Sequence, residues 1–308
     1  MAEGPGHHGD PTGEYLAVRV GAALVDPSWS AVRVVGPDAV AFLEGLLTQR
    51  LEPGRSVRSF LLGPRGKLRA IIRAVVGDDD VVLVTDAGRR DTLATDLRHY
   101  RIRVKAEVRD DERPVRLLLG SGADDALGGA VVPAGGWVAV GEGVVADVTV
   151  GPFRGYLLVG VDPVGEVTPV GSLAWTARRI EAGEPVMDVD VDEGTIPQET
   201  GLVPSSVDFS KGCYLGQELV ARIDTRGHVN QRLVGLRLGT NLLPPVGCQV
   251  MTATRPVGTV TSVGESLDLR APVALGMVRR EAADGDLVDL TWEGGSATAT
   301  VVALPMVD

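Results

Sequence analysis

From Asn230 onward the sequence consists of short apolar runs separated by glycine, proline and aspartate, and helical periodicity is absent. The runs read LVGLRL, VGTVTSV, VALGMVRR, LVDLTW and ATATVVAL. A chain punctuated in this way cannot form long helices, and the pattern is typical of a small antiparallel barrel or sandwich of about five or six strands. The sequence therefore predicts a C-terminal β-barrel domain over residues 236–308.

The part of the chain before this region mixes strands with helices. AVRVV predicts a strand, and the following residues 36–51 predict a helix with Pro37 in its first turn. The other elements expected here are a strand pair at 67–76 and 80–86, a helix at 91–100 and a strand at 101–108. Hairpins among helices indicate an α+β fold rather than a doubly wound sheet. We expect two α+β domains, over residues 15–110 and 111–235.

One helix of the second domain is delimited at both ends by its sequence, SLAWTARRIEAGEP. Ser172 is of a residue type that caps helix starts, and Gly183 followed by Pro185 is a stop signal. We therefore expect a helix from Ser172 to the residue before Gly183.

Charge and cysteine content exclude several classes of function. The net charge of −11 disfavours direct binding to nucleic acid, which needs clustered lysine and arginine. The two cysteines, Cys213 and Cys248, lie far apart without Cys-x-x-Cys or Cys/His spacing. The sequence therefore predicts no zinc site and no iron–sulfur cluster held by this chain alone.

The N-terminal residues predict no targeting or membrane segment. They lack a basic-then-apolar signal pattern, and no apolar run of the chain is long enough to span a bilayer. A cytoplasmic protein without a membrane partner is therefore expected. Residues 1–14 are rich in glycine and proline and are expected to form a disordered tail, in which His7 and His8 make no metal site.

The most informative segment for chemistry is Lys211–Glu218, KGCYLGQE, which precedes an amphipathic run. Leu215, Leu219 and Ile223 recur at helical spacing, so Cys213 is expected at or just before a helix N-terminus. The helix dipole and the neighbouring Lys211 would both stabilise a thiolate there. The alternative is that Cys213 is a small buried hydrophobic residue, as lone cysteines often are.

KGCY followed by GQE resembles the signature of the YgfZ family, folate-binding relatives of the glycine-cleavage T-protein, an aminomethyltransferase. The resemblance continues at Arg222, Gly227 and Arg232 downstream. Upstream it includes RRIEAGEP, IPQET and FLEGLLTQ, in the family's order. The chain is thus similar to this family over nearly its whole length after the N-terminal residues.

The resemblance implies three domains in a ring around a central site for tetrahydrofolate. Glu199 of IPQET matches the glutamate that contacts the pterin, and a carboxylate can accept two adjacent N–H groups of that ring. Arginines at the rim would hold the anionic tail of folate. The resemblance implies a reactive Cys213 assisted by Lys211. The remaining cofactor contacts that it implies are Tyr214, Gln217, Glu218, Arg179, Arg222, Arg226 and Arg232.

One departure from the aminomethyltransferases concerns the acid that aligns the transferred one-carbon unit. Arg69 and Ala70 stand where this acid is expected, and the next acids are Asp78–Asp80 in a turn. Arg50 likewise replaces an acid found in many YgfZ relatives. Whether the chain is an enzyme is therefore left open by the sequence.

The resemblance implies an accessory protein that binds tetrahydrofolate and supports assembly or repair of iron–sulfur clusters in client enzymes. Its partners would be folate and iron–sulfur client or assembly proteins. Two alternatives remain at this point. The chain could be a folate-dependent one-carbon transferase, or a non-catalytic module that binds a partner protein.

Overall fold

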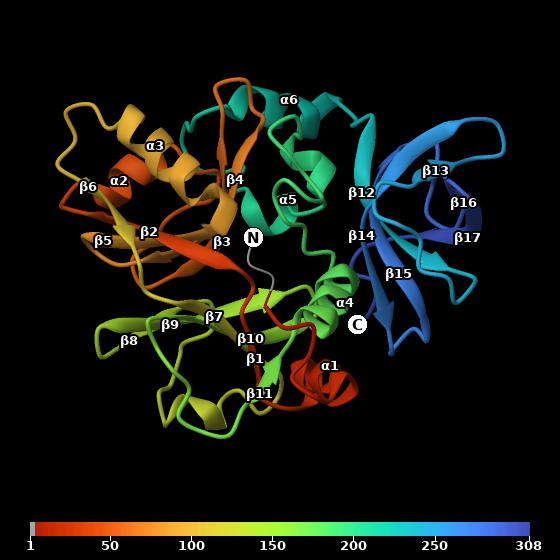
Figure 1. Cartoon of the computed structure of the whole chain (residues 1–308). Coiled ribbons are helices and arrows are strands. Elements are labelled where there is room, and N and C mark those ends of the chain that lie inside the picture. The colour runs from red at the N-terminus through yellow and green to blue at the C-terminus, as the bar shows by residue number, and fades with distance from the viewer. Residues whose placement is uncertain (1–3) are drawn as a thin grey trace.

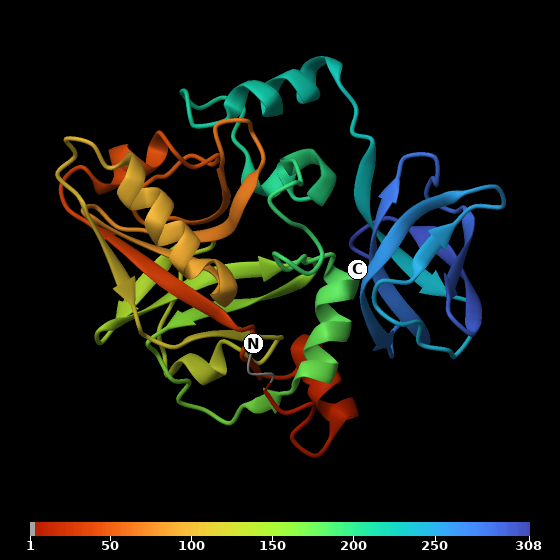
Figure 2. The same ribbon diagram turned by 45° about the horizontal axis from the view of Figure 1, so that its top comes forward.

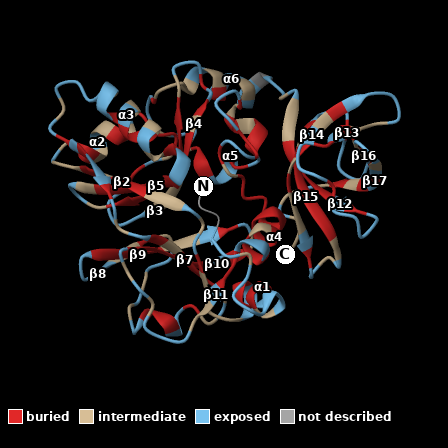
Figure 3. Cartoon of the chain, viewed as in Figure 1, coloured by how far each residue is buried: buried red, intermediate tan, exposed pale blue. Residues whose placement is uncertain are grey.

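The computed structural model describes residues 4–308, except for the side chain of residue 226. The chain forms three units, each built on its own sheet, around the centre of the molecule (Figure 1, Figure 2). Two units are α+β layers and the third is a closed barrel, which confirms the expected fold class. Buried residues follow the strands of all three units (Figure 3). None of the described helices is long and apolar enough to cross a membrane.

The first unit is an antiparallel sheet covered on one face by two helices. Its elements are β2 (Trp29–Val35), α2 (Ala39–Glu44), β3 (Ser56–Leu62), β4 (Leu68–Val76), β5 (Asp80–Asp86), η1 (Ala87–Arg89), α3 (Arg90–Tyr100) and β6 (Glu107–Asp111). The strand order is β3-β4-β5-β2-β6. Ile72 of β4 and Leu83 of β5 pack in one apolar cluster with Leu43 of α2 and Leu97 of α3. This cluster is the core of the first unit.

The strand pair and the helix at 91–100 were predicted correctly in this unit, but two other elements were not. β4 and β5 pair antiparallel with Val76 opposite Val81. The helix predicted over 36–51 ends at Glu44, because Leu47 leaves the helix to form a bridge with Leu61. The strand predicted over 101–108 begins only at Glu107, because Arg103 has a φ of 58°, which breaks an extended chain.

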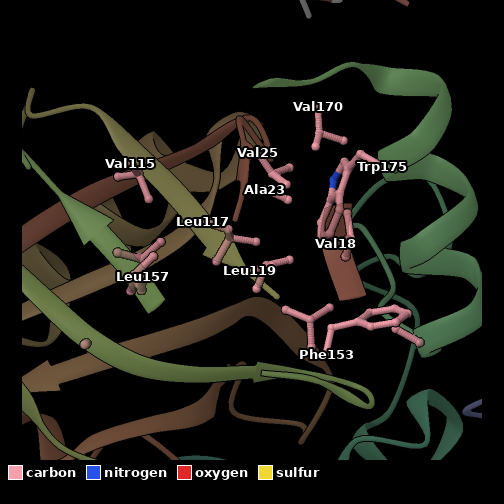
Figure 4. Close-up of a cluster of buried hydrophobic side chains, with 14 of the residues drawn as sticks. Val18, Ala23, Val25, Val115, Leu117, Leu119, Phe153, Leu157, Val170 and Trp175 are labelled. Carbon is pink, nitrogen blue, oxygen red and sulfur yellow. The ribbon is translucent and has the colours of Figure 1, made fainter. Parts of the chain in front are cut away.

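The second unit is a six-stranded sheet packed against two helices. Its elements are α1 (Pro11–Val20), β1 (Ala23–Val25), β7 (Val115–Leu119), η2 (Asp125–Leu127), β8 (Trp137–Val140), β9 (Gly143–Val150), β10 (Phe153–Val159), β11 (Thr168–Val170) and α4 (Ser172–Ala182). The strand order is β11-β1-β7-β10-β9-β8. Trp175 of α4 and Val18 of α1 face Leu117 and Leu119 of β7 in the core of this unit (Figure 4). The N-terminal residues therefore belong to the second unit and not to the first.

The expectation of a disordered tail over residues 1–14 is wrong for the residues that the structure describes; residues 1–3 lie outside them. Asp10 caps α1 by accepting a hydrogen bond from Gly13 N. Glu14 is buried and accepts hydrogen bonds from the backbone N–H groups of His8 and Gly171. The glycines and prolines of this stretch thus allow tight packing. A composition rich in these residues does not by itself distinguish a packed segment from a disordered one.

The helix predicted at 172–182 is confirmed as α4, with Gly183 ending it at a φ of 69°. Its cap differs from the prediction, since Gly171 and not Ser172 is the N-cap residue. Backbone N–H groups of the first turn donate to the carbonyl oxygens of Pro5 and Gly6. The N-terminal segment therefore supplies the hydrogen-bond acceptors that a capping side chain would otherwise supply.

A connecting segment, residues 183–226, joins the second unit to the barrel and carries η3 (Pro197–Thr200), α5 (Val203–Ser206) and α6 (Gln217–Arg226). This segment was predicted to belong to the second domain, over residues 111–235. Its apolar residues Leu202, Tyr214 and Val220 instead form a cluster with Phe60 and Ile71, which belong to the first sheet. The segment therefore covers part of the face of the first sheet that α2 and α3 leave free.

The third unit is the C-terminal barrel predicted from the sequence. Its strands are β12 (Gln231–Leu238), β13 (Gln249–Met251), β14 (Pro256–Ser266), β15 (Ala271–Arg279), β16 (Leu287–Trp292) and β17 (Gly295–Val302). They close in the order β12-β15-β14-β13-β16-β17, and all pairs are antiparallel. The barrel begins at Gln231, slightly before the predicted boundary at 236. Cys248 is buried in its core.

Candidate functional site

A cavity of about 640 Å³ lies where the three units and the connecting segment meet. This volume is within the usual range for sites that bind small molecules. Residues of every part of the chain line it, among them Arg58, Arg73, Asp147, Gly151, Gln198, Thr200, Arg232 and Leu304. No single unit could form this cavity alone.

Two arginines of the first sheet form part of the cavity wall. Arg58 of β3 and Arg73 of β4 both line the cavity, and both donate to the buried carboxylate of Glu184. The distances are 2.6 Å from Arg58 Nη2 to Glu184 Oε2 and 2.6 Å from Arg73 Nη2 to Glu184 Oε1. Burial alone would raise the pKa of Glu184, but the two guanidinium groups outweigh it and lower that pKa. Glu184 is therefore ionised.

Gln198 of η3 lines the cavity and has a buried acceptor without a partner. Its Nε2 donates to the carbonyl oxygen of Val220 on α6 at 2.9 Å, which fixes the orientation of the amide. Its Oε1 is buried and has no hydrogen-bond partner among the described residues. A buried acceptor without a partner is costly, and such an atom in a native structure calls for an explanation.

The carboxylate of Glu199, the predicted pterin contact, accepts a hydrogen bond within its own turn. Its Oε2 accepts the backbone N–H of Ile196 at 3.0 Å, and the side chain is not among those that line the cavity. Burial raises the pKa of Glu199, although the hydrogen bond from Ile196 opposes that rise. Its neighbours Gln198 and Thr200 line the cavity instead.

The predicted arginines lie in different places. Arg232 of β12 lines the cavity and also pairs with Asp284 at 2.7 Å. Arg179 is buried, where its Nη1 contacts Asp190 Oδ2 at 2.8 Å and its Nη2 donates to Ser262. Arg179 thus ties α4 to the barrel. Arg222 is exposed on α6, and the side chain of Arg226 lies outside the described part of the chain.

Lys211 is held by the first unit and does not face the cavity. Its Nζ lies within 3.0 Å of the carbonyl oxygens of Glu44, Leu47 and Gln49 and of Glu44 Oε2. Only 1% of the side chain is exposed. Burial lowers the pKa of Lys211, although Glu44 opposes that effect. This ammonium group supplies donors to carbonyl oxygens that the end of α2 leaves unpaired.

Residues 211–216, here called the signature loop, leave the cysteine accessible. Cys213 is exposed, whereas the neighbouring Tyr214 is buried against the first sheet. α6 begins at Gln217, and Gln217 Oε1 accepts the backbone N–H of Tyr214 at 3.0 Å. Glu218 is exposed. Cys213 therefore precedes the helix by a loop and is not at its N-terminus.

The structure does not bring the predicted site residues together. Among the predicted residues whose side chains the structure describes, Arg232 is the one that lines the cavity, and the signature loop contributes none of the lining. Arg58, Arg73 and Gln198 line the cavity but were not predicted from the sequence. A signal for Arg73 was present, because an arginine within the otherwise apolar run IIRAVV is expected to be buried and paired.

Comparisons with known proteins agree with this architecture. The family model described as "Glycine cleavage T-protein C-terminal barrel domain" matches residues 231–308. The crystal structure of the glycine cleavage system aminomethyltransferase T from Bartonella henselae superposes with a TM-score of 0.85 at 24% identity, covering 96% of this chain and 89% of that one. At this identity the likeness shows a common fold.

Two curated relatives have the name "tRNA-modifying protein YgfZ". The one from Pectobacterium carotovorum subsp. carotovorum (strain PC1) is 28% identical over 258 residues, which cover 77% of this chain and 78% of the relative. The one from Klebsiella pneumoniae (strain 342) is 30% identical over 229 residues, covering 69% of this chain and 70% of the relative. Because this similarity spans more than two thirds of both proteins, the chain belongs to the YgfZ family.

Proposed function

We propose that this chain is a tetrahydrofolate-binding accessory protein that supports assembly or repair of iron–sulfur clusters in client enzymes. The observation that carries the folate half of the proposal is the central cavity of about 640 Å³, lined by residues of all three units and by Gln198, whose buried amide oxygen has no partner among the described residues. A pterin ring presents N–H groups that such an acceptor can bind.

The other lining residues also suit a folate. Val57, Leu202, Leu233 and Leu304 offer apolar surface to flat rings. Arginines face the same space and suit the carboxylates of the glutamate tail. When bound, tetrahydrofolate would supply the capacity to carry a one-carbon unit, while the residues of this chain bind and orient it.

Cys213 supports the partner half of the proposal. The thiol is exposed and lies outside the cavity, so it is accessible to another protein rather than to the folate. Two cysteines cannot supply the four ligands of a cluster, so Cys213 would act as one transient ligand in contact with a client or assembly protein.

The name of the relatives suggests a client that acts on tRNA. A net charge of −11 disfavours direct tRNA binding by this chain. An accessory role toward an iron–sulfur enzyme that modifies tRNA would agree with both observations.

A one-carbon transferase is less well supported by the site. Arg69 is paired with Asp96 and Glu193, and Ala70 is buried in the core of the first unit. Neither residue supplies the acid that the aminomethyltransferases use. β4 instead gives the cavity Arg73, which cannot act as a base.

Folate binding is tested by calorimetric titration with tetrahydrofolate. The wild-type protein should bind, and Gln198→Met should bind roughly tenfold or more weakly, because it removes the acceptor at similar volume. Gln249→Met, at an exposed position of β13, is the matched control and should bind as the wild type does. Absence of binding by the wild-type protein would overturn the folate half.

The role of the thiol is tested in a strain that lacks the gene. Cys213→Ser should fail to restore the activity of iron–sulfur enzymes while still binding tetrahydrofolate. Cys248→Ala is the control, since Cys248 is buried in the barrel. Full restoration by Cys213→Ser would contradict the role proposed for this cysteine.

A further inference from the structure

The ammonium group of Lys211 has all of its hydrogen-bond donors engaged by the first unit. Its Nζ lies 3.0, 2.9 and 2.9 Å from the carbonyl oxygens of Glu44, Leu47 and Gln49, and 3.0 Å from Glu44 Oε2. A lysine ammonium has three N–H donors, so these four acceptors take all of them. Because only 1% of the side chain is exposed, Lys211 has no donor left for a neighbouring group.

The three carbonyl groups belong to one short stretch of the first unit, residues 44–49, where α2 ends. Two backbone hydrogen bonds hold the chain around the signature loop to the same stretch. The N–H of Leu215 donates to the carbonyl oxygen of Gly45 at 3.0 Å, and the N–H of Asp208 donates to that of Thr48 at 3.0 Å. The signature loop is therefore fixed to the end of α2 before, at and after Lys211.

The middle of the loop is the part that these contacts leave free. Tyr214 is buried in the cluster on the first sheet, and its backbone N–H donates to Gln217 Oε1 at 3.0 Å. Between Tyr214 and Lys211, Gly212 has open space around its Cβ position and Cys213 is exposed. Cys213 is thus carried at the exposed tip of a loop that is anchored on both sides.

We propose that Lys211 is a positioning residue for Cys213: its ammonium group fixes the signature loop to the end of α2, so that the thiol is presented to a client at one place. The family resemblance implied that Lys211 assists a reactive Cys213 directly. An ammonium group whose donors are all engaged cannot donate to a thiolate. A group held in one place loses less freedom when a partner contacts it, which favours that contact. This inference rests on the proposed function, because it concerns contact between the thiol and a client.

The variants Lys211→Met and Gln217→Met remove the two anchors separately. Methionine is similar in length to both side chains, but it has no donor and only a weak acceptor. The first variant removes a charge and the second does not. Lys67→Met, at an exposed lysine after the β3–β4 turn, is the matched control. All variants are made with Cys248→Ala, so that Cys213 is the single thiol.

Hydrogen exchange and alkylation are measured on the folded proteins. The amides of residues 212–216 should exchange roughly tenfold or more faster in both variants, while those of β16 in the barrel stay as in the wild type. The pH at which iodoacetamide alkylates Cys213 at half its maximal rate should be the same in the wild type and in both variants. In a strain that lacks the gene, both variants should restore iron–sulfur enzymes less well than Lys67→Met does.

Four results would overturn the proposal. A half-maximal pH that rises in Lys211→Met but not in Gln217→Met would show that the charge of Lys211 acts on the thiol. Unchanged exchange of the loop would show that it is not anchored in this way. Faster exchange in β16 as well would show a structural role for the whole chain. Full restoration by variants with a faster-exchanging loop would show that the position of the thiol does not matter.

Gln217→Met keeps the proposal testable if Lys211→Met does not fold, since it removes a neutral, half-buried side chain. Its loop exchange and its restoration of the enzymes then decide the outcome. Failure of the proposed function appears differently, because Cys213→Ser would restore the enzymes fully while both anchor variants still changed the exchange of the loop.

Discussion

At the scale of single residues, Asp86 shows how the packing around the cavity changes the chemistry of an acid. It ends β5, and its Oδ2 accepts the backbone N–H of Met187 at 2.9 Å. The residue keeps some exposed surface, but the neighbouring atoms exclude most of the water from around its carboxyl group. This burial raises the pKa of Asp86 to about 6, although Met187 and the nearby Arg73 oppose the rise, and Glu184 adds to it.

The raised pKa of Asp86 predicts a pH-dependent stability. Because its folded pKa is about 6 and its ordinary value is 3.8, the folded state binds the proton more tightly. Its contribution to stability is therefore complete below about pH 4 and is lost as the pH rises through 6. A shift of about two units corresponds to about 3 kcal/mol. Asp86→Asn should gain about that much relative to the wild type between pH 4 and 7, as measured by urea denaturation.

The free energies of unfolding of the wild type and of Asp86→Asn are compared at each pH, so that the contributions of other titrating groups cancel. Asp79→Asn removes an acid from an exposed turn and serves as the control. If the stabilities of the wild type and Asp86→Asn follow parallel curves across this range, the raised pKa is wrong.

At the scale of elements, the sequence correctly predicted those helices and strands that a local residue pattern determines. The β4–β5 hairpin, α3 and the barrel each depend on apolar spacing and turn residues that lie within the element. The N-terminal residues could not be predicted in this way, because Glu14 is positioned by Gly171, a residue distant in the sequence. The prediction of a helix over 36–51 was wrong for the same reason, because Leu47 forms a β-bridge with Leu61, which lies outside the predicted helix.

The signature loop offers a matched pair of glycines for an element-scale prediction. Gly216 has a φ of 78°, and a Cβ there would lie 2.6 Å from the carbonyl oxygen of Gly63 in the β3–β4 turn. Gly212 has open space around its Cβ position. Gly216→Ala should lower the free energy of unfolding by about 1–3 kcal/mol, through backbone strain and the clash. Denaturant titration measures it.

Gly212→Ala is the control within the same loop and should stay within about 1 kcal/mol of the wild type. If the two variants have equal stability, the close approach between the signature loop and the β3–β4 turn is wrong.

At the scale of the whole molecule, the cavity explains why the site was harder to predict than the fold. Arg58, Gln198 and Arg232 come from three parts of the chain, and only tertiary packing brings them to one cavity. The family signature drew attention to Cys213, whose loop lies outside that cavity. Sequence motifs identified the family, but the cavity-lining side chains depend on how the three units meet.

A ligand held by all three units should stabilise all of them together. Tetrahydrofolate at 100 times its dissociation constant should stabilise the folded chain by about 2.7 kcal/mol. Hydrogen exchange that occurs by local opening should slow in β3, in β9 and in β12, each of which contributes lining residues. β16 contributes none and serves as the internal control.

Hydrogen exchange mass spectrometry with and without tetrahydrofolate makes this measurement on the full chain. Protection confined to one sheet would show that the ligand binds a single unit, which contradicts a site at their junction. Joint protection of the three sheets, with β16 changed less, would instead require that the ligand contacts each of them. The same data would show whether the signature loop is protected, and an unprotected Cys213 would agree with a thiol that remains available to a partner while folate is bound.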